Sequence, residues 1–169
     1  MKYRSKAFTL IELLVVVAII GILSAIGVVS YNSYTSFSKK EAAKAQHKMI
    51  VNIVQTELLK CSMGQKLILK KMTSGIVVDQ PDLCPSISTG IITYDTLMVF
   101  SDHFKVLNFK NTYFPQWNAV AVCSVSRDTV YHNHGDGGGS CIDSRENYEI
   151  IVGTNIAKYE TLIVKIKIN

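Results

Sequence analysis

The chain has few prolines and none of the motifs that mark common catalytic sites. Its serine, histidine and aspartate residues are scattered, and neither a nucleophile elbow, a phosphate-binding loop nor a CxxC pair occurs. We therefore predict no catalytic residue, no cofactor and no resident metal, and a protein that is not an enzyme. Only three of 169 residues are proline, and none lies between residues 31 and 60. Because proline interrupts helices, its absence allows a long helix in that stretch.

Charge is also sparse at the start of the chain. Lys2, Arg4 and Lys6 precede a long apolar run, and Glu12 is the single acidic residue near the start of that run. Removal of residues 1–7 would lower the formal charge from +5 to +2, because three basic residues would be lost. Most of the basic excess is therefore expected to be a positive-inside orientation signal, not a nucleic-acid surface.

Residues 13–29 are almost entirely apolar, and with residues 8–11 they reach the ~20 residues needed to cross a bilayer. A cleaved secretory signal is the first alternative, since Ala25, Ile26 and Gly27 have suitable spacing for a signal peptidase. Glu12 and a helical pattern that continues past Gly27 argue against it. A carboxylate in lipid costs roughly 2.5 to 3.5 kcal/mol at the bilayer centre, so Glu12 is expected to be functional.

Residues 31–60 predict an amphipathic helix that continues directly from the membrane segment. Small and apolar residues recur at steps of three and four in an expected buried stripe of Ala42, Ala45, Met49 and Ile53, broadened by Ile50, Val54 and Leu58. A lone histidine on this helix, His47, is expected to be solvated. The second half of the long helix is expected to pack against a globular head formed by residues 61–169.

Strand patterns dominate the second half of the head. They cover residues 91–100, 104–109, 117–125, 148–153 and 162–168, and in the last of these apolar residues alternate with lysines. Residues 61–90 have turn-forming glycines and prolines and are expected to be mainly loop. We predict an α+β fold, with a long N-terminal helix packed on a four- to five-stranded antiparallel sheet.

All four cysteines follow the apolar run, at Cys61, Cys84, Cys123 and Cys141. An even number in a translocated domain favours disulfides and a head that matures outside the cytoplasm. Three pairings are open to four cysteines, and spacing does not choose among them. We favour pairing of nearest neighbours, in which each bridge closes a loop of about 20 residues and contributes on the order of 3 kcal/mol.

The sequence AFTLIELLVVVAIIGIL at positions 7–23 resembles the N-terminal signature of type IV pilins and the related pseudopilins. The resemblance extends more loosely to Tyr31 and Tyr34 and covers about 28 residues. It implies a leader at residues 1–7, cleavage by a prepilin peptidase between Ala7 and Phe8, and methylation of Phe8. It also implies an assembly helix at residues 8–30 that continues as the amphipathic helix at 31–60, and a head at 61–169 with a disulfide-bounded C-terminal loop. The family most often has glycine in place of Ala7, and many members have proline in place of Val29.

Cleavage at this position would place a new amine close to Glu12. The amine of Phe8 lies four residues before Glu12, and the same carboxylate on a neighbouring subunit offers a second partner. Burial of this pair would fix the axial register between helices, even where desolvation offsets much of the attraction. Ala18, Gly21 and Ala25 would allow close approach of the helices.

The resemblance implies a structural subunit that polymerises through its N-terminal helix into a pilus, or fimbrium, for adhesion, twitching motility or DNA uptake during competence. It implies an inner-membrane precursor with a single pass and a periplasmic head, followed by an extracellular filament. Its partners would be other copies, other pilins, the peptidase, the assembly platform and the membrane. Two alternatives remain open: a pseudopilin of a type II secretion system, and a minor pilin that binds DNA or a surface at the filament tip.

Two further groups of residues were considered as ligand sites. His132, His134 and Asp136 would suit a transition metal, and Asp136 with Asp143 would suit calcium, although a solvated hairpin tip explains the same residues. Aromatic residues near lysines would suit single-stranded DNA, although a core and a wet strand edge would use them equally well. This second group consists of Tyr113, Phe114, Trp117, Lys105 and Lys110. By resemblance, the loop between Cys123 and Cys141 would carry adhesive or antigenic variation.

Overall fold

The computed structural model describes residues 8–125, 130–131, 137–144 and 148–168. The chain divides into two compact units, Met1–Ser38 and Lys39–Asn169. One helix, α1 (Leu10–Ser62), has residues in both.

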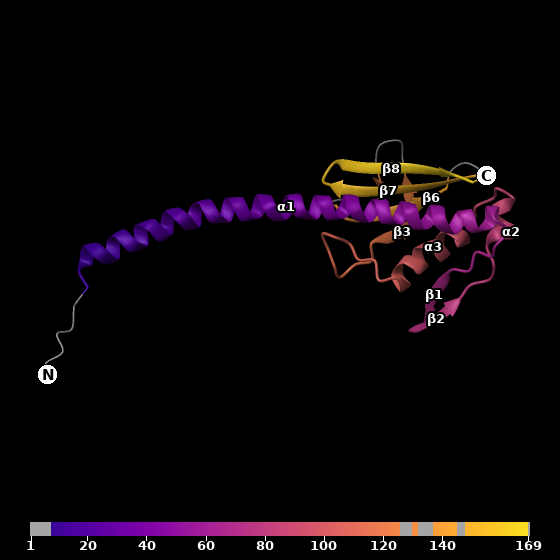
Figure 1. Ribbon diagram of the computed structural model, residues 1–169, viewed down its shortest axis with the longest axis horizontal. Coiled ribbons are helices and arrows are strands. Elements are labelled where there is room, and N and C mark those ends of the chain that lie inside the picture. Colours follow the sequence, from indigo (N-terminus) through magenta and orange to yellow (C-terminus); the bar gives the residue numbers. More distant parts are fainter. Residues whose placement is uncertain (1–7, 126–129, 132–136, 145–147, 169) are drawn as a thin grey trace. The chain divides into compact units, whose positions relative to one another are not determined.

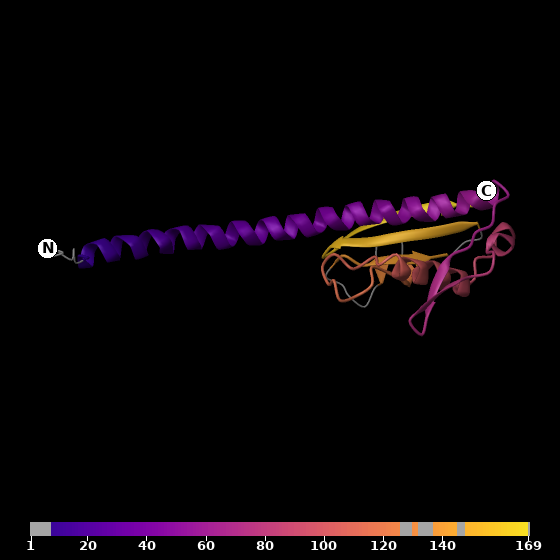
Figure 2. The ribbon, with the colours of Figure 1, turned by 60° about the horizontal axis from the view of Figure 1, so that its bottom comes forward.

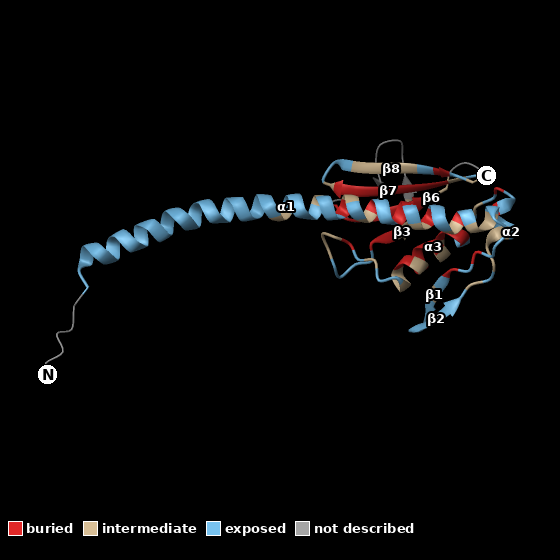
Figure 3. Ribbon diagram, in the orientation of Figure 1, coloured by how far each residue is buried: buried red, intermediate tan, exposed pale blue. Residues whose placement is uncertain are grey.

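In the first unit, the described side chains from Phe8 to Tyr34 are all exposed (Figure 3). An 18-residue window of α1 has a mean hydropathy of 2.9 with no residue buried, so by length and composition this helix is suited to cross a membrane. An α-helix satisfies its backbone polar groups internally, which is the condition for crossing a bilayer. The exposed apolar side chains therefore need lipid or other helices as their surroundings.

In the second unit, α1 buries one stripe of side chains against the rest of the head (Figure 1). The stripe consists of Ala43, His47, Ile50, Val51, Val54 and Leu58. It confirms Ile50, Val54 and Leu58 as buried, but Ala42, Ala45 and Met49 are exposed and Ile53 is only half-buried. The predicted centre of the stripe was wrong because His47 was counted as a polar surface residue, whereas it is only 5% exposed.

A four-stranded sheet lies beside this part of α1, as both ribbon views show (Figures 1 and 2). Its strands are β3 (Val120–Val122), β6 (Ser140–Asp143), β7 (Glu149–Ala157) and β8 (Glu160–Lys167), in the order β3-β6-β7-β8. The structure confirms the α+β class and the long helix packed on a four-stranded sheet. The sheet is mixed and not purely antiparallel, since β3 runs parallel to β6. Two parallel neighbouring strands need a crossover connection and not a tight hairpin, so this pair could not be predicted as a simple antiparallel neighbour.

Two smaller sheets complete the strands. A hairpin is formed by β1 (Lys70–Thr73) and β2 (Ile76–Asp79), and β4 (Ser124–Val125) pairs with β5 (Val130–Tyr131). The turn of the first hairpin has positive φ at both central residues, Ser74 and Gly75, as a type I′ turn requires. This hairpin and β6 were missed because their segments were taken as loop.

Two predicted strands, at 91–100 and 104–109, are wrong. Most of that stretch is the helix α3 (Tyr94–Val106), which follows the short helix α2 (Cys84–Ser88). Thr93 caps α3 by accepting a hydrogen bond from the backbone N–H of Thr96 at 3.3 Å. Leu97, Phe100 and Phe104 are buried at helical spacing, and this period outweighs the β-forming residue types.

The core joins these elements. Phe100 and Phe104 of α3 meet α1, the sheet and the segment before β1, where Leu67 and Leu69 are fully buried. The rings of Phe104 and Phe109 pack edge to face, with centroids 5.3 Å apart. The predicted strands at 117–125, 148–153 and 162–168 are confirmed by β3 with β4, by β7 and by β8.

Candidate assembly and processing site

Thr9 and Glu12 form a capping box at the start of α1. Glu12 Oε2 accepts hydrogen bonds from the backbone N–H and the hydroxyl of Thr9, each at 2.8 Å, and the backbone N–H of Glu12 donates to Thr9 Oγ1 at 3.4 Å. Such a pair satisfies two backbone donors that a helix N-terminus leaves free. This role was not predicted, although the spacing T-x-x-E ahead of an apolar run signals it.

Phe8 and Glu12 lie on one face of this end of the helix. Together with Ile11, Val15 and Val16 they line a shallow depression. Phe8 is 83% exposed, so the chain itself covers neither the aromatic ring nor the carboxylate. Both hydrogen bonds to the carboxylate end on Oε2, and no described residue donates to Oε1. One oxygen of Glu12 therefore remains available for a further donor.

Ala7 and the basic residues Lys2, Arg4 and Lys6 lie outside the described residues. Phe8 and Thr9 precede the first helical residue, so the predicted cleavage position falls just before the cap of α1. A peptide bond outside a helix is accessible to a peptidase without unwinding of the helix.

Gly21 and Gly27 of the apolar segment face open space within the described part of the chain. A Cβ added at Gly21 or Gly27 would meet no described atom within 4 Å. Glycine in a helix interior costs roughly 1 kcal/mol relative to alanine. Since the fold of the single chain does not require these glycines, close approach of another helix is the physical use that remains for them.

Disulfides join Cys61 to Cys84 and Cys123 to Cys141, the pairing of nearest neighbours along the chain. The first ties the last turn of α1 to the first residue of α2. The second joins the residue after β3 to a fully buried position in β6. Both bridges therefore staple elements of the head to one another.

Of the residues considered for metal binding, only Asp143 lies among the described residues. His132, His134 and Asp136 lie outside the described residues, and so does Arg127 of the Cys123–Cys141 loop. Among the described residues, no group of three or more His, Cys, Asp and Glu side chains could hold a metal ion. Asp143 is placed in β6.

The aromatic and basic residues considered for DNA are mostly engaged within the head. Tyr113 donates its hydroxyl to the carbonyl of Ile156 at 2.8 Å, and burial raises the pKa of this phenol. Phe114 and Trp117 stack on each other with centroids 4.8 Å apart. Lys105 pairs with Asp102 at 2.6 Å, and the ammonium of Lys110 donates to Asn118 at 3.4 Å.

His47 was expected in solvent, but the structure buries it in the head. Its Nδ1 lies 2.8 Å from Thr154 Oγ1, which in turn lies 2.7 Å from Ser140 Oγ. Its Nε2 is buried and has no hydrogen-bond partner among the described residues. Burial lowers the pKa of His47 below its ordinary value of 6.5. The prediction of a solvated side chain was therefore wrong.

Residues 2–28 match the profile of the prokaryotic N-terminal methylation motif. This motif is the prepilin signal of type IV pilins and pseudopilins, and its presence supports a pilin-like or pseudopilin protein. No curated protein and no solved structure matches it. The motif implies processing by a prepilin peptidase and assembly with other pilins, and with the apolar helix it fits anchoring in the inner membrane before assembly. A structural role is the one that such a motif indicates.

Proposed function

We propose that the protein is a structural subunit of a type IV pilus that polymerises through the first half of α1 into a surface filament. Prepilin peptidase would cut the peptide bond between Ala7 and Phe8 and release residues 1–7 as a leader. Methylation of the new amino group would leave it cationic and able to donate hydrogen bonds. The precursor would wait in the inner membrane with its basic leader in the cytoplasm.

This proposal rests on the carboxylate of Glu12, which has one oxygen bonded within its own helix and one without a described donor. Oε2 is held by the cap of its own helix, while no described residue donates to Oε1. Phe8 of the same chain lines the same depression as Glu12, and cleavage would give it an amine. A neighbouring chain would offer an equivalent amine. A charged pair that is desolvated between packed helices is strongly destabilised by loss of either partner, so correct axial register would be enforced.

The head supports the expected location. Two disulfides in the second unit require an oxidising compartment, which for a protein anchored in the inner membrane is the periplasm. The head would therefore fold and oxidise on the periplasmic side before assembly. This orientation agrees with the positive-inside signal of the leader.

Intact mass spectrometry of the mature protein tests the processing step. The expected mass lacks residues 1–7, gains one methyl group at Phe8 and shows four oxidised cysteines. A mass that retains the leader would overturn the proposal. Because pseudopilins use the same signal, deletion of the gene provides the second test. Loss of surface filaments with normal protein export supports the pilus subunit, whereas blocked export with normal filaments supports a type II secretion pseudopilin.

A further inference from the structure

Among the described strands, the second unit has an unpaired strand edge on each of two opposite sides. β8 is the outermost strand of the four-stranded sheet, whose other end, β3, packs against α3. α3 also packs against β1, and β2 lies beyond β1. The order across the unit is therefore β8-β7-β6-β3-α3-β1-β2, and both ribbon views place β8 and the hairpin on opposite sides (Figures 1 and 2). An open strand edge is a template for pairing with another chain.

The first edge, β2, is apolar and entirely exposed. Ile76, Val77 and Val78 are 67%, 46% and 44% exposed, and the fourth residue, Asp79, is exposed as well. Among the described residues, Asp79 forms no ion pair. Three successive β-branched apolar residues on a two-stranded hairpin leave two faces and one edge in water, an arrangement that gains stability from another strand.

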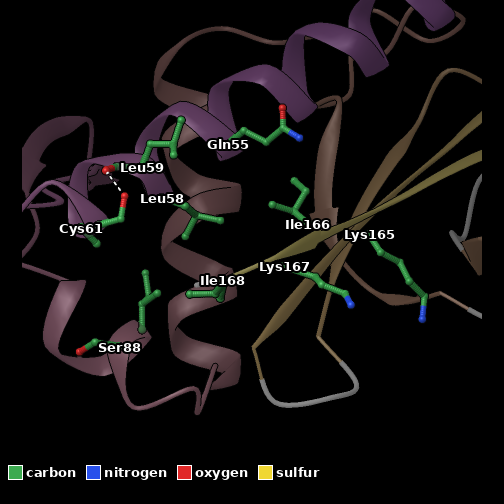
Figure 4. A pocket seen from close by; sticks show the side chains of 11 residues that line it. Gln55, Leu58, Leu59, Cys61, Ser88, Lys165, Ile166, Lys167 and Ile168 are labelled. Atoms are coloured by element: carbon green, nitrogen blue, oxygen red, sulfur yellow. Dashed lines mark hydrogen bonds between the residues drawn. The ribbon is translucent and has the colours of Figure 1, made fainter.

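The second edge, β8, borders an apolar groove of about 570 Å³. The four consecutive residues 165–168 all line it, opposite the last turns of α1 and the helix α2 (Figure 4). Successive side chains of a strand point to opposite faces, so a groove touched by all four residues reaches the backbone at the end of this outermost strand. Ile166 and Ile168 with Leu58 supply apolar lining. Lys165, which pairs with Glu149 at 3.4 Å but is still more than half exposed, and Lys167 supply the positive charge.

The backbone groups of the odd-numbered residues of β8 point away from β7, toward the open edge. The N–H of Ile168 donates to the carbonyl of Tyr148 at 2.7 Å, in continuation of the β7–β8 ladder. Alternate residues of an antiparallel strand bond to opposite sides. The N–H and C=O groups of Lys165 and Lys167 therefore point outward.

The same argument applies to β2. The N–H of Gln80 donates to the carbonyl of Leu69 at 2.8 Å, in continuation of the β1–β2 ladder. Even-numbered residues of β2 therefore bond to β1. The backbone groups of Val77 and Asp79 point outward.

We propose that β2 of one copy adds as an antiparallel strand to β8 of the next copy. The register that matches the outward backbone groups places Asp79 opposite Lys165 and Val77 opposite Lys167. On the other face it places Val78 and Ile76 opposite Ile166 and Ile168, so two aliphatic side chains enter the groove. The outward backbone groups, the opposite charges of Asp79 and Lys165, and the facing aliphatic side chains thus all agree with this one register.

This contact joins two different surfaces and is therefore heterologous, so repetition produces a ring or an open helical array instead of a two-fold dimer. A filament requires the open array. The contact rests on the proposed function only in that filament assembly brings the copies together. Neighbouring copies would then be held together by two separate contacts: helix packing between their first units and strand pairing between their heads.

Cysteine cross-linking in cells that assemble filaments tests the register. Ile76 and Ile168 would form a non-hydrogen-bonded pair with Cα atoms about 4.5 Å apart, within disulfide range. Co-expression of an Ile76→Cys chain and an Ile168→Cys chain should give a covalent dimer, while each single variant alone should give none. The matched control combines Ile76→Cys with Tyr159→Cys, because Tyr159 is 94% exposed but lies at the far end of β8. That control should not cross-link.

The outcomes separate the two proposals. A dimer specific to the 76–168 combination, together with normal filaments, supports strand addition. Filaments without this dimer overturn strand addition and leave the pilus function standing. A dimer from Ile76→Cys alone would indicate a symmetric contact between hairpins and would also overturn it. Absence of filaments from the unmodified protein would remove the pilus function and this inference with it.

Discussion

The imidazole of His47 on α1 lies 2.8 Å from the hydroxyl of Thr154 on β7, so a buried polar bridge joins the long helix to the sheet. Ser140 on β6 extends the bridge by a hydroxyl contact of 2.7 Å. Three elements of the head are thereby fixed through one titratable group. Burial disfavours the imidazolium, and a proton on the buried Nε2 would have no acceptor among the described residues, so the folded head favours the neutral ring.

Acid should therefore destabilise the head through His47. Its folded-state pKa is lowered below the unfolded value of 6.5, so the unfolded state binds the proton more readily. The contribution of the neutral ring is complete above pH 6.5 and is lost as the pH falls from 6.5 toward the lower folded-state pKa. Urea unfolding of the full chain in detergent at pH 7.5 and at pH 5 should show a drop in midpoint that His47→Gln reduces.

His103 provides the control for this measurement. Burial also lowers its pKa, and its Nδ1 accepts a hydrogen bond from the backbone N–H of Lys70 at 3.1 Å. His103→Gln should remove its own share of the pH dependence and leave the share of His47. If His47→Gln and the unmodified chain lost equal stability on acidification, the role assigned to His47 would be wrong.

The two functions of Glu12 can be separated by a pair of substitutions. Glu12→Gln keeps the capping box, because glutamine at this position also bonds back to the cap, but it removes the charge needed to pair with the amine of Phe8. Thr9→Ala removes the cap, at about 1 kcal/mol, and keeps the charge. Electron microscopy should show filaments lost in Glu12→Gln and retained in Thr9→Ala, with both chains cleaved and inserted in the membrane.

The reverse result would reassign the carboxylate. Filaments retained in Glu12→Gln but lost in Thr9→Ala would mean that the start of the helix, and not charge pairing, is what assembly requires. Cleavage and membrane insertion, followed by mass and fractionation, show that each variant reaches the stage at which assembly begins.

The sequence predicts the elements whose pattern is local and fails where tertiary packing decides. The apolar run and the alternation in β8 specify the membrane helix and one half-buried strand without further information. Residues 91–109 have β-forming types, yet Thr93 caps a helix and Phe100 and Phe104 bury one of its faces. The direction of β3 could not be predicted either, because it depends on the route of the chain between distant strands.

The same division applies to the candidate site. The motif around Glu12 is contiguous, so its residues could be recognised in order along the chain. The bridge from His47 to Thr154 joins positions 107 residues apart, and only the folded chain brings them together. A histidine in a sequence with charged neighbours is usually solvated, and the apolar residues around its helical stripe were the only available sign of burial.

The disulfide between Cys61 and Cys84 should stabilise the head more than any single side-chain contact at its surface. It closes a loop with a sequence separation of 23, for which restriction of the unfolded chain is worth about 3 kcal/mol. Substitution of both cysteines by serine should lower the unfolding midpoint of the oxidised protein. Addition of a reductant to the unmodified chain should lower it further, because reduction also opens Cys123–Cys141. A midpoint unchanged by the double substitution would show that the loop is already ordered in the unfolded state.

Gly90, which lies against Tyr148, is expected to tolerate substitution less well than Gly64. It has φ of +73°, and a Cβ there would lie 2.3 Å from the ring of Tyr148, whose backbone N–H also donates to the Gly90 carbonyl at 3.2 Å. Gly64 is the matched control, since it has φ of +70° but no atom within 4 Å of an added Cβ. Gly64→Ala should cost about 1 to 2 kcal/mol from backbone strain alone, whereas Gly90→Ala should cost more because the ring must also move. Comparison of the two unfolding free energies isolates the steric part, and equal losses would show that the Tyr148 ring moves aside freely.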